Sequence, residues 1–199
     1  MANDNTGARA AAATSRFAGL PNLLTIVRIS AIPVLIWLLR TPSQELATVA
    51  FVIFFVASWT DFFDGHLARR YGLVTTMGKL LDPLADKLLV ISVLIMLAMM
   101  DRSPGLPAWL LVIIVGRELA VTGLRAIAVG EGIVLGAEAS GKLKMVLQTI
   151  GAHALILHYT FAGISFYSLG MILLVASTGV GLWSAAEYYT MVFRQLSRR

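Results

Sequence analysis

One stretch of the chain limits its possible folds more than any other. The 42 residues from Met145 to Ala186 contain no Asp, Glu, Lys or Arg. A membrane-spanning helix needs about 20 mostly apolar residues, so this stretch is long enough for two. Gly and Ser residues in its middle, in the sequence AGISFYSLG, favour a turn there. We therefore expect two spanning helices, at about 143–164 and 169–192.

The rest of the chain has the same apolar character. Its mean hydropathy is +0.80, and 58% of its residues are hydrophobic while 14% are charged. A soluble domain of this size has too little interior to bury so many apolar side chains. We therefore predict an all-α integral membrane protein with six transmembrane helices. The four further spans are expected at about 22–40, 46–69, 78–100 and 107–129, within a single domain over 20–199 that follows a mobile cytoplasmic tail over 1–19.

The distribution of Lys and Arg predicts the orientation in the membrane. Six spans place both termini on one side, and most Lys and Arg residues lie at that side, whereas Arg40 and Arg102 lie at the other. Loops rich in Lys and Arg stay in the cytoplasm, so both termini are predicted to be cytoplasmic. The net charge of +5 fits contact with anionic membrane lipid, and no nucleic-acid-binding motif accompanies it. The chain has no cysteine, which excludes disulfides and thiolate metal sites.

Four aspartates occur where the second predicted helix ends and the third begins. Asp61 and Asp64 are separated by three positions and Asp82 and Asp86 by four, so each pair shares one helix face. Because the two helices are adjacent and antiparallel, both pairs can meet at the cytoplasmic side. Clustered carboxylates repel one another, and a divalent cation removes this repulsion. Oxygen ligands without His or Cys suit Mg²⁺ or Mn²⁺. The alternative is a set of solvated carboxylates paired with neighbouring Lys and Arg.

A second charged group lies in the fourth predicted helix and at the start of the fifth. It consists of Arg117, Arg125, Lys142 and Lys144. Cations inside a bilayer are costly and usually functional, and several that converge on one cavity form an anion site. A substrate that carries its own phosphate would explain them. As alternatives, Arg117 pairs with Glu118 or an aspartate, and the two lysines only anchor the topology.

The segment DFFDGHLARRYGLVTTMGKLLDPLAD resembles the signature D-x-x-D-G-x-x-A-R-x8-G-x-x-x-D-x-x-x-D of the CDP-alcohol phosphotransferase family. The resemblance implies six transmembrane helices, a homodimer, and transfer of a phosphatidyl group from a CDP-linked lipid to an alcohol with release of CMP. It also implies that the four aspartates hold a metal pair and that Asp86 takes the proton of the attacking hydroxyl. The implied cytidine diphosphate site comprises Gly65, Ala68, Arg69, Thr75 and Gly78, with Asn22, Thr25 and Arg28 closing the nucleotide pocket.

Further segments narrow the resemblance within the family. PNLLTIVR, PLADKLLV, GRELAVTGLRAIA and ASGKLKMVLQT are similar to bacterial members that join sn-glycerol 3-phosphate to CDP-diacylglycerol. This implies an enzyme of the bacterial inner membrane with its active site on the cytoplasmic face, whose four cations receive the acceptor phosphate. Inositol phosphate, serine or phosphatidylglycerol are alternative acceptors. A cation or proton transporter is another alternative, because intramembrane aspartates also build ion pathways, although there they lie near the membrane midplane.

Overall fold

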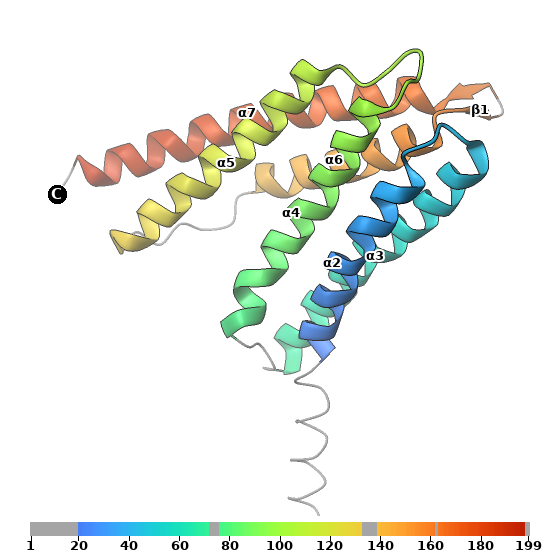
Figure 1. Ribbon diagram of the computed structural model, residues 1–199. Helices are drawn as coiled ribbons and strands as arrows, with labels where there is room; N and C mark the ends of the chain where they lie inside the picture. The colour runs from blue at the N-terminus through green and yellow to red at the C-terminus, as the bar shows by residue number, and fades with distance from the viewer. Residues whose placement is uncertain (1–19, 72–75, 133–138, 162, 198–199) are drawn as a thin grey trace, which may run out of the picture. The chain divides into compact units, whose positions relative to one another are not determined.

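The computed structural model describes residues 20–71, 76–132, 139–161 and 163–197, and for 20–24, 60–71 and 76–83 it describes the backbone alone. These ranges form six helices and one short hairpin (Figure 1). The helices are α2 (Leu20–Leu38), α3 (Gln44–Tyr71), α4 (Thr76–Met99), α5 (Ala108–Gly130), α6 (Ala139–Leu157) and α7 (Phe166–Leu196). The strands are β1 (Thr160–Phe161) and β2 (Ile164–Ser165).

The six helices lie where the sequence predicts them, with one difference of several residues. We expect the fifth helix to continue to residue 164, but α6 ends at Leu157. His158 has a φ of 57°, which is the left-handed conformation that ends a helix. The chain then forms the hairpin, in which Thr160 pairs with Ser165. The Ser165 hydroxyl accepts a hydrogen bond from the Ser168 amide at 3.2 Å and so caps the start of α7.

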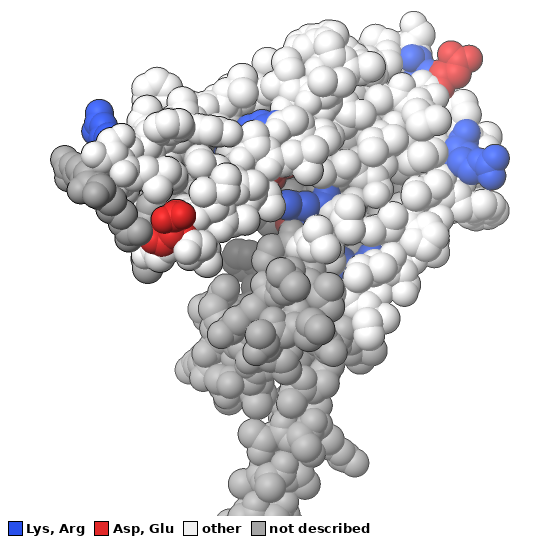
Figure 2. Space-filling view, turned by 60° about the vertical axis from the view of Figure 1, so that its left-hand side comes forward, with Lys and Arg blue, Asp and Glu red and all other residues white. Residues whose placement is uncertain are grey.

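The described surface is consistent with a membrane protein. Among the described residues, α7 is the one helix long and apolar enough to cross a bilayer, and shorter apolar helical segments occur at Thr25–Leu38 and Gln44–Trp59. Most of the visible described surface is uncharged (Figure 2). Large apolar side chains are exposed on α5 and α7, such as Val112 at 69% and Trp183 at 68%. In a bilayer such side chains contact lipid, so their exposure carries no penalty.

The chain forms two compact units, one up to Val93 and the other from Leu94 onward. In the first unit, α2 packs against α3. Its fully buried side chains include Leu35 near the end of α2, Leu39 directly after α2 and Phe54 in the middle of α3. This packing holds α2 against α3, the helix that carries the first half of the aspartate motif.

In the second unit, α7 is the central element, because both α6 and α5 pack against it. Its buried face repeats every three or four residues and includes small side chains at Gly170, Ser177, Gly181 and Ser184. Small residues let membrane helices approach closely. A Cβ added at Gly170 would lie only 2.9 Å from the carbonyl oxygen of Gly151 on α6.

Polar contacts connect the loops at the end of the second unit where α5 and α7 begin. The Nη1 of Arg102 donates to the carbonyl oxygens of Leu155 and Ile156 at 3.4 and 3.1 Å, in the last turn of α6. The Tyr167 hydroxyl donates to the Gly105 carbonyl oxygen at 3.1 Å. Burial lowers the pKa of the Arg102 guanidinium below its ordinary value. The contacts of Arg102 satisfy helix-end carbonyls that have no partner within the helix.

Candidate active site

The aspartate motif lies on two helices, as its spacing predicts. Asp61 and Asp64 belong to the last turns of α3, which continues to Tyr71. Asp82 and Asp86 belong to the first turns of α4, which begins at Thr76. The helical backbone that places each pair on one face is therefore present on both sides of the segment 72–75.

Most residues predicted for this part of the site lie outside the described side chains. These are Asn22, Asp61, Asp64, Gly65, Ala68, Arg69, Thr75, Gly78 and Asp82. Asp86 is described and is partly buried. The described side chains include no group of three or more Asp, Glu, His or Cys that could hold a metal ion. Because three of the four predicted ligands fall outside them, the metal site stays a prediction.

Two residues predicted to close the nucleotide pocket are buried on α2. Thr25 is 1% exposed and Arg28 is 3% exposed. Their spacing of three positions places them on one face of the helix. Burial of a charged guanidinium group on the face of an apolar membrane helix costs free energy, and such a group is usually retained for a function. Their burial is compatible with a pocket lining, and the role in nucleotide binding stays a prediction.

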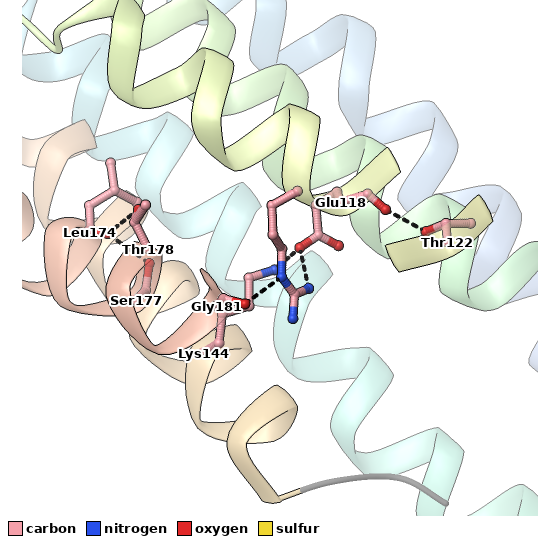
Figure 3. Close-up of polar contacts among 8 residues, drawn as sticks. Glu118, Thr122, Lys144, Leu174, Ser177, Thr178 and Gly181 are labelled. Carbon is pink, nitrogen blue, oxygen red and sulfur yellow. Dashed lines mark hydrogen bonds and ion pairs between the residues drawn. The ribbon is translucent and has the colours of Figure 1, made fainter. Parts of the chain in front are cut away.

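The second unit brings two of the four predicted phosphate-binding cations together. Lys144 on α6 and Arg117 on α5 both donate to Oε1 of Glu118 on α5, and the distance from the Nη1 of Arg117 is 3.0 Å. Figure 3 shows Glu118 and Lys144 pointing toward each other between the two helices. All three side chains are nearly buried, with exposures of 11% for Arg117, 11% for Lys144 and 8% for Glu118. Two cations and one carboxylate leave this cluster, the Glu118 triad, with one excess positive charge.

Helix α7 also contacts the Glu118 triad, through Gly181. The Nε of Arg117 donates to the Gly181 carbonyl oxygen at 3.0 Å. A Cβ added at Gly181 would lie 3.2 Å from Cγ of Lys144 and 3.5 Å from Nε of Arg117. The absence of a side chain at this position therefore leaves room for both cations beside α7.

The other two predicted cations lie apart from the Glu118 triad. The Nε of Arg125 donates to the Tyr188 hydroxyl at 3.2 Å, and its guanidinium carbon lies 5.5 Å from the centre of that ring. Arg125 is eight positions after Arg117, which corresponds to about 12 Å along a helix. Lys142 is exposed at the start of α6. The structure thus joins Arg117 to Lys144, places Arg125 on Tyr188 and leaves Lys142 at the surface.

An open groove of about 720 Å³ lies where α6 begins and α7 ends. Its lining includes Ser140 from α6 and Glu187, Thr190 and Arg194 from α7. The groove has apolar and polar lining, and its charges are of both signs, from Glu187 and Arg194. It therefore does not by itself select for an anion.

Two residues of this region were not predicted as site residues. The sequence suggested Glu118 only as an alternative partner of Arg117, and that pair is present. Its second partner, Lys144, lies 26 positions away, so no local spacing indicates the contact. Tyr188 belongs to the buried face of α7, and it packs with Leu124, Ala128 and Val192 in an apolar cluster.

A family model and several curated relatives of this chain all carry the names of phosphatidyltransferases or of a phosphatidylglycerophosphate synthase. The family model described as CDP-alcohol phosphatidyltransferase matches residues 18–183. A CDP-diacylglycerol–glycerol-3-phosphate 3-phosphatidyltransferase of Bacillus subtilis is 39% identical, over 86% of this chain and 93% of the relative. A protein of the same name from Rickettsia typhi is also 39% identical, over 85% of this chain and 98% of the relative. A probable phosphatidylglycerophosphate synthase of Mycobacterium tuberculosis is 41% identical, over 70% of this chain and 66% of the relative.

Proposed function

The chain belongs to the CDP-alcohol phosphatidyltransferase family, and from this membership we propose that it transfers the phosphatidyl group of CDP-diacylglycerol to sn-glycerol 3-phosphate. The products are phosphatidylglycerophosphate, a phospholipid precursor, and CMP. The observation that carries the proposal is the near full-length similarity, at 39% identity, to relatives named for this reaction. The buried cations of the second unit support an acceptor that is itself an anion.

The chemistry assigned to the aspartates follows from the charges involved. The acceptor hydroxyl oxygen forms a bond to the phosphorus of the phosphatidyl group, and the bond from that phosphorus to the CMP oxygen breaks. Asp86 accepts the hydroxyl proton, and CMP leaves with the electron pair of the broken bond. Asp61, Asp64, Asp82 and Asp86 would hold two Mg²⁺ or Mn²⁺ ions, which supply positive charge to the pyrophosphate. Four carboxylates at helical spacing, with no His or Cys among them, fit such hard cations.

The remaining motif residues are assigned to binding. Arg69 offsets the negative charge that develops on the leaving CMP. Gly65, Ala68, Thr75 and Gly78 line the cytidine diphosphate site, because small residues leave room for a ligand beside the helices. Asn22, Thr25 and Arg28 close the nucleotide pocket from α2. The burial of Thr25 and Arg28 supports this assignment.

The acceptor phosphate is assigned to the cations of the second unit, Arg117, Arg125, Lys142 and Lys144. Guanidinium groups bind phosphate through two parallel hydrogen bonds, and Lys adds a point charge. Inositol phosphate would use the same cations, whereas serine would not need them. The relatives named for glycerol 3-phosphate favour that acceptor over the alternatives.

We further propose six transmembrane helices, both termini and the active site on the cytoplasmic side, and a homodimer. The bias of Lys and Arg supports the orientation. We propose the bacterial cell membrane as the location, because the relatives cited are bacterial. The homodimer rests on the family resemblance of the motif.

The test is CMP release by the purified protein in detergent, with CDP-diacylglycerol present and Mg²⁺ or Mn²⁺ at a fixed concentration. We expect release that requires both glycerol 3-phosphate and the metal ion. Release with serine or inositol phosphate in place of glycerol 3-phosphate would keep the reaction class and replace the acceptor. The absence of release with every alcohol would refute the proposed function and reopen the transporter alternative.

A further inference from the structure

The Glu118 triad contains a carboxylate where an anion site would be expected to have only cations. Glu118 is 6% exposed and accepts from Arg117 and Lys144 through the same oxygen. A negative charge beside a phosphate site lowers its affinity by direct repulsion. Glu118 lies between Arg117 and Lys144, the two cations proposed to bind the acceptor phosphate. Attraction between the site and the phosphate does not explain why a carboxylate is present there.

The geometry points to Glu118 as a positioning residue of the acceptor-phosphate site, and this inference rests on the proposed function. Arg117 comes from α5 and Lys144 from α6, and among the described residues no backbone hydrogen bond joins these two helices. Two cations that bind one phosphate must be held close together although they repel each other. A carboxylate shared between them offsets that repulsion and fixes both side chains before the substrate arrives. Pre-ordering of this kind lowers the entropic cost of binding.

The surroundings of Glu118 fit this role. The Gly181 carbonyl oxygen accepts from Nε of Arg117, so Arg117 is held at two points of its guanidinium group. One turn later on α5, the Thr122 hydroxyl donates to the main-chain carbonyl oxygen of Glu118 at 2.7 Å. Figure 3 shows Lys144 reaching toward the Glu118 carboxylate, with Gly181 beside Lys144. Within the triad, the two cations outnumber the carboxylate by one charge, which is the sign that suits an anion.

The inference predicts an effect opposite in sign to that of direct repulsion. If Glu118 only repels the substrate, Glu118→Gln lowers the KM for glycerol 3-phosphate. If Glu118 positions the two cations, the same substitution raises this KM, because the cations separate when the carboxylate is removed. Loss of one partner of a buried charge pair weakens binding by at least about tenfold. The KM for CDP-diacylglycerol should stay within about twofold, since the Glu118 triad belongs to the acceptor side.

The experiment compares Glu118→Gln, Glu118→Asp and a matched control, Glu131→Gln. Glu131 is an exposed glutamate that follows α5, so its substitution makes the same change of charge outside the triad. We expect a raised KM for glycerol 3-phosphate in Glu118→Gln, a smaller rise in Glu118→Asp and an unchanged or lowered value in Glu131→Gln. An unchanged or lowered KM in Glu118→Gln, or equal increases for both substrates, overturns the inference. If Glu118→Gln does not fold, Glu118→Asp provides the same comparison.

A second measurement separates this inference from the proposed function. The rise in the thermal unfolding midpoint on addition of glycerol 3-phosphate reports binding without turnover. Binding to the wild-type protein that weakens in Glu118→Gln supports the inference even if no CMP is released. Wild-type protein that releases CMP but needs no phosphate on its acceptor overturns the inference. Wild-type protein that glycerol 3-phosphate neither stabilises nor turns over overturns both proposals.

Discussion

At Gly170, α7 lies so near α6 that a side chain does not fit. A Cβ there would lie 2.7 Å from Cγ of Leu155 and 2.9 Å from the Gly151 carbonyl oxygen. Gly170→Ala therefore forces the two helices apart, and overpacking of this kind costs about 1–3 kcal/mol. We expect a lower thermal unfolding midpoint in detergent.

Gly179→Ala on the same helix is the control for Gly170→Ala. A Cβ at Gly179 would have nothing within 4 Å. Alanine favours a helix over glycine by about 1 kcal/mol, so this variant should be as stable as the wild type or more stable. Equal destabilisation by both substitutions would contradict close packing of α6 on α7 at Gly170.

At the level of a single carboxylate, Asp86 is the proposed base and can be tested by Asp86→Asn. An amide cannot accept the proton of the acceptor hydroxyl, and loss of general base catalysis costs about 10²- to 10⁴-fold in rate. We expect kcat to fall by at least about 100-fold, while the unfolding midpoint in the absence of metal changes little. Asp101→Asn makes the same change at an exposed residue outside the motif and should keep full activity. Near wild-type turnover in Asp86→Asn would remove Asp86 from the mechanism.

Individual site residues were predictable from the sequence only where their signal is local. The aspartate pairs are visible because residues three or four positions apart share a helix face. The contact of Lys144 with Glu118 was not visible, since it depends on which residues of two helices lie opposite each other. That register depends partly on small residues such as Gly181 on a third helix, where an added Cβ would press on Lys144. No spacing within one segment contains this information.

At the level of elements, the apolar stretches located all six helices within a few residues, apart from the end of α6. The sequence from Leu157 to Ile164 contains no Asp, Glu, Lys or Arg, so the absence of charge alone predicts a longer helix than the structure contains. Backbone conformation decides the end instead, because His158 is left-handed and the hairpin follows. The helices were predictable because a bilayer requires long apolar segments, whereas their ends depend on individual contacts.

One of these contacts gives a prediction for the end of α6. Arg102 donates to two carbonyl oxygens of its last turn, and a cation at a helix C-terminus also interacts favourably with the helix dipole. Arg102→Ala removes both effects, and we expect a loss of stability of about 1–2 kcal/mol. The measurement is the unfolding midpoint in detergent. Arg40→Ala removes a cation from another loop, where the side chain is exposed, and should have little effect. Similar losses in the two variants would argue that Arg102 acts only through its net charge.

At the scale of the whole molecule, the proposed metal site links the two helices of the aspartate motif. Without a cation, four carboxylates from α3 and α4 repel each other, so a chelator should lower both activity and stability. We expect complete loss of CMP release after treatment with EDTA and recovery on addition of Mg²⁺ or Mn²⁺. The unfolding midpoint should fall in parallel in the wild type. Activity that survives exhaustive chelation would contradict a catalytic metal.

The orientation in the membrane can be tested on α5, because the two ends of this helix must lie on opposite sides if it spans. Its 23 residues extend about 35 Å, and the hydrocarbon core of a bilayer is about 30 Å thick. Asp101 lies shortly before α5 and Glu131 directly after it, and both are exposed. The natural chain has no cysteine, so single substitutions to cysteine give unambiguous labelling. In intact bacterial cells, a membrane-impermeant maleimide should label Asp101→Cys, and it should label Glu131→Cys only after permeabilisation. The reverse pattern would invert the proposed topology and place the acceptor-binding cations outside the cytoplasm. Labelling of both variants from outside would mean that α5 does not cross the membrane.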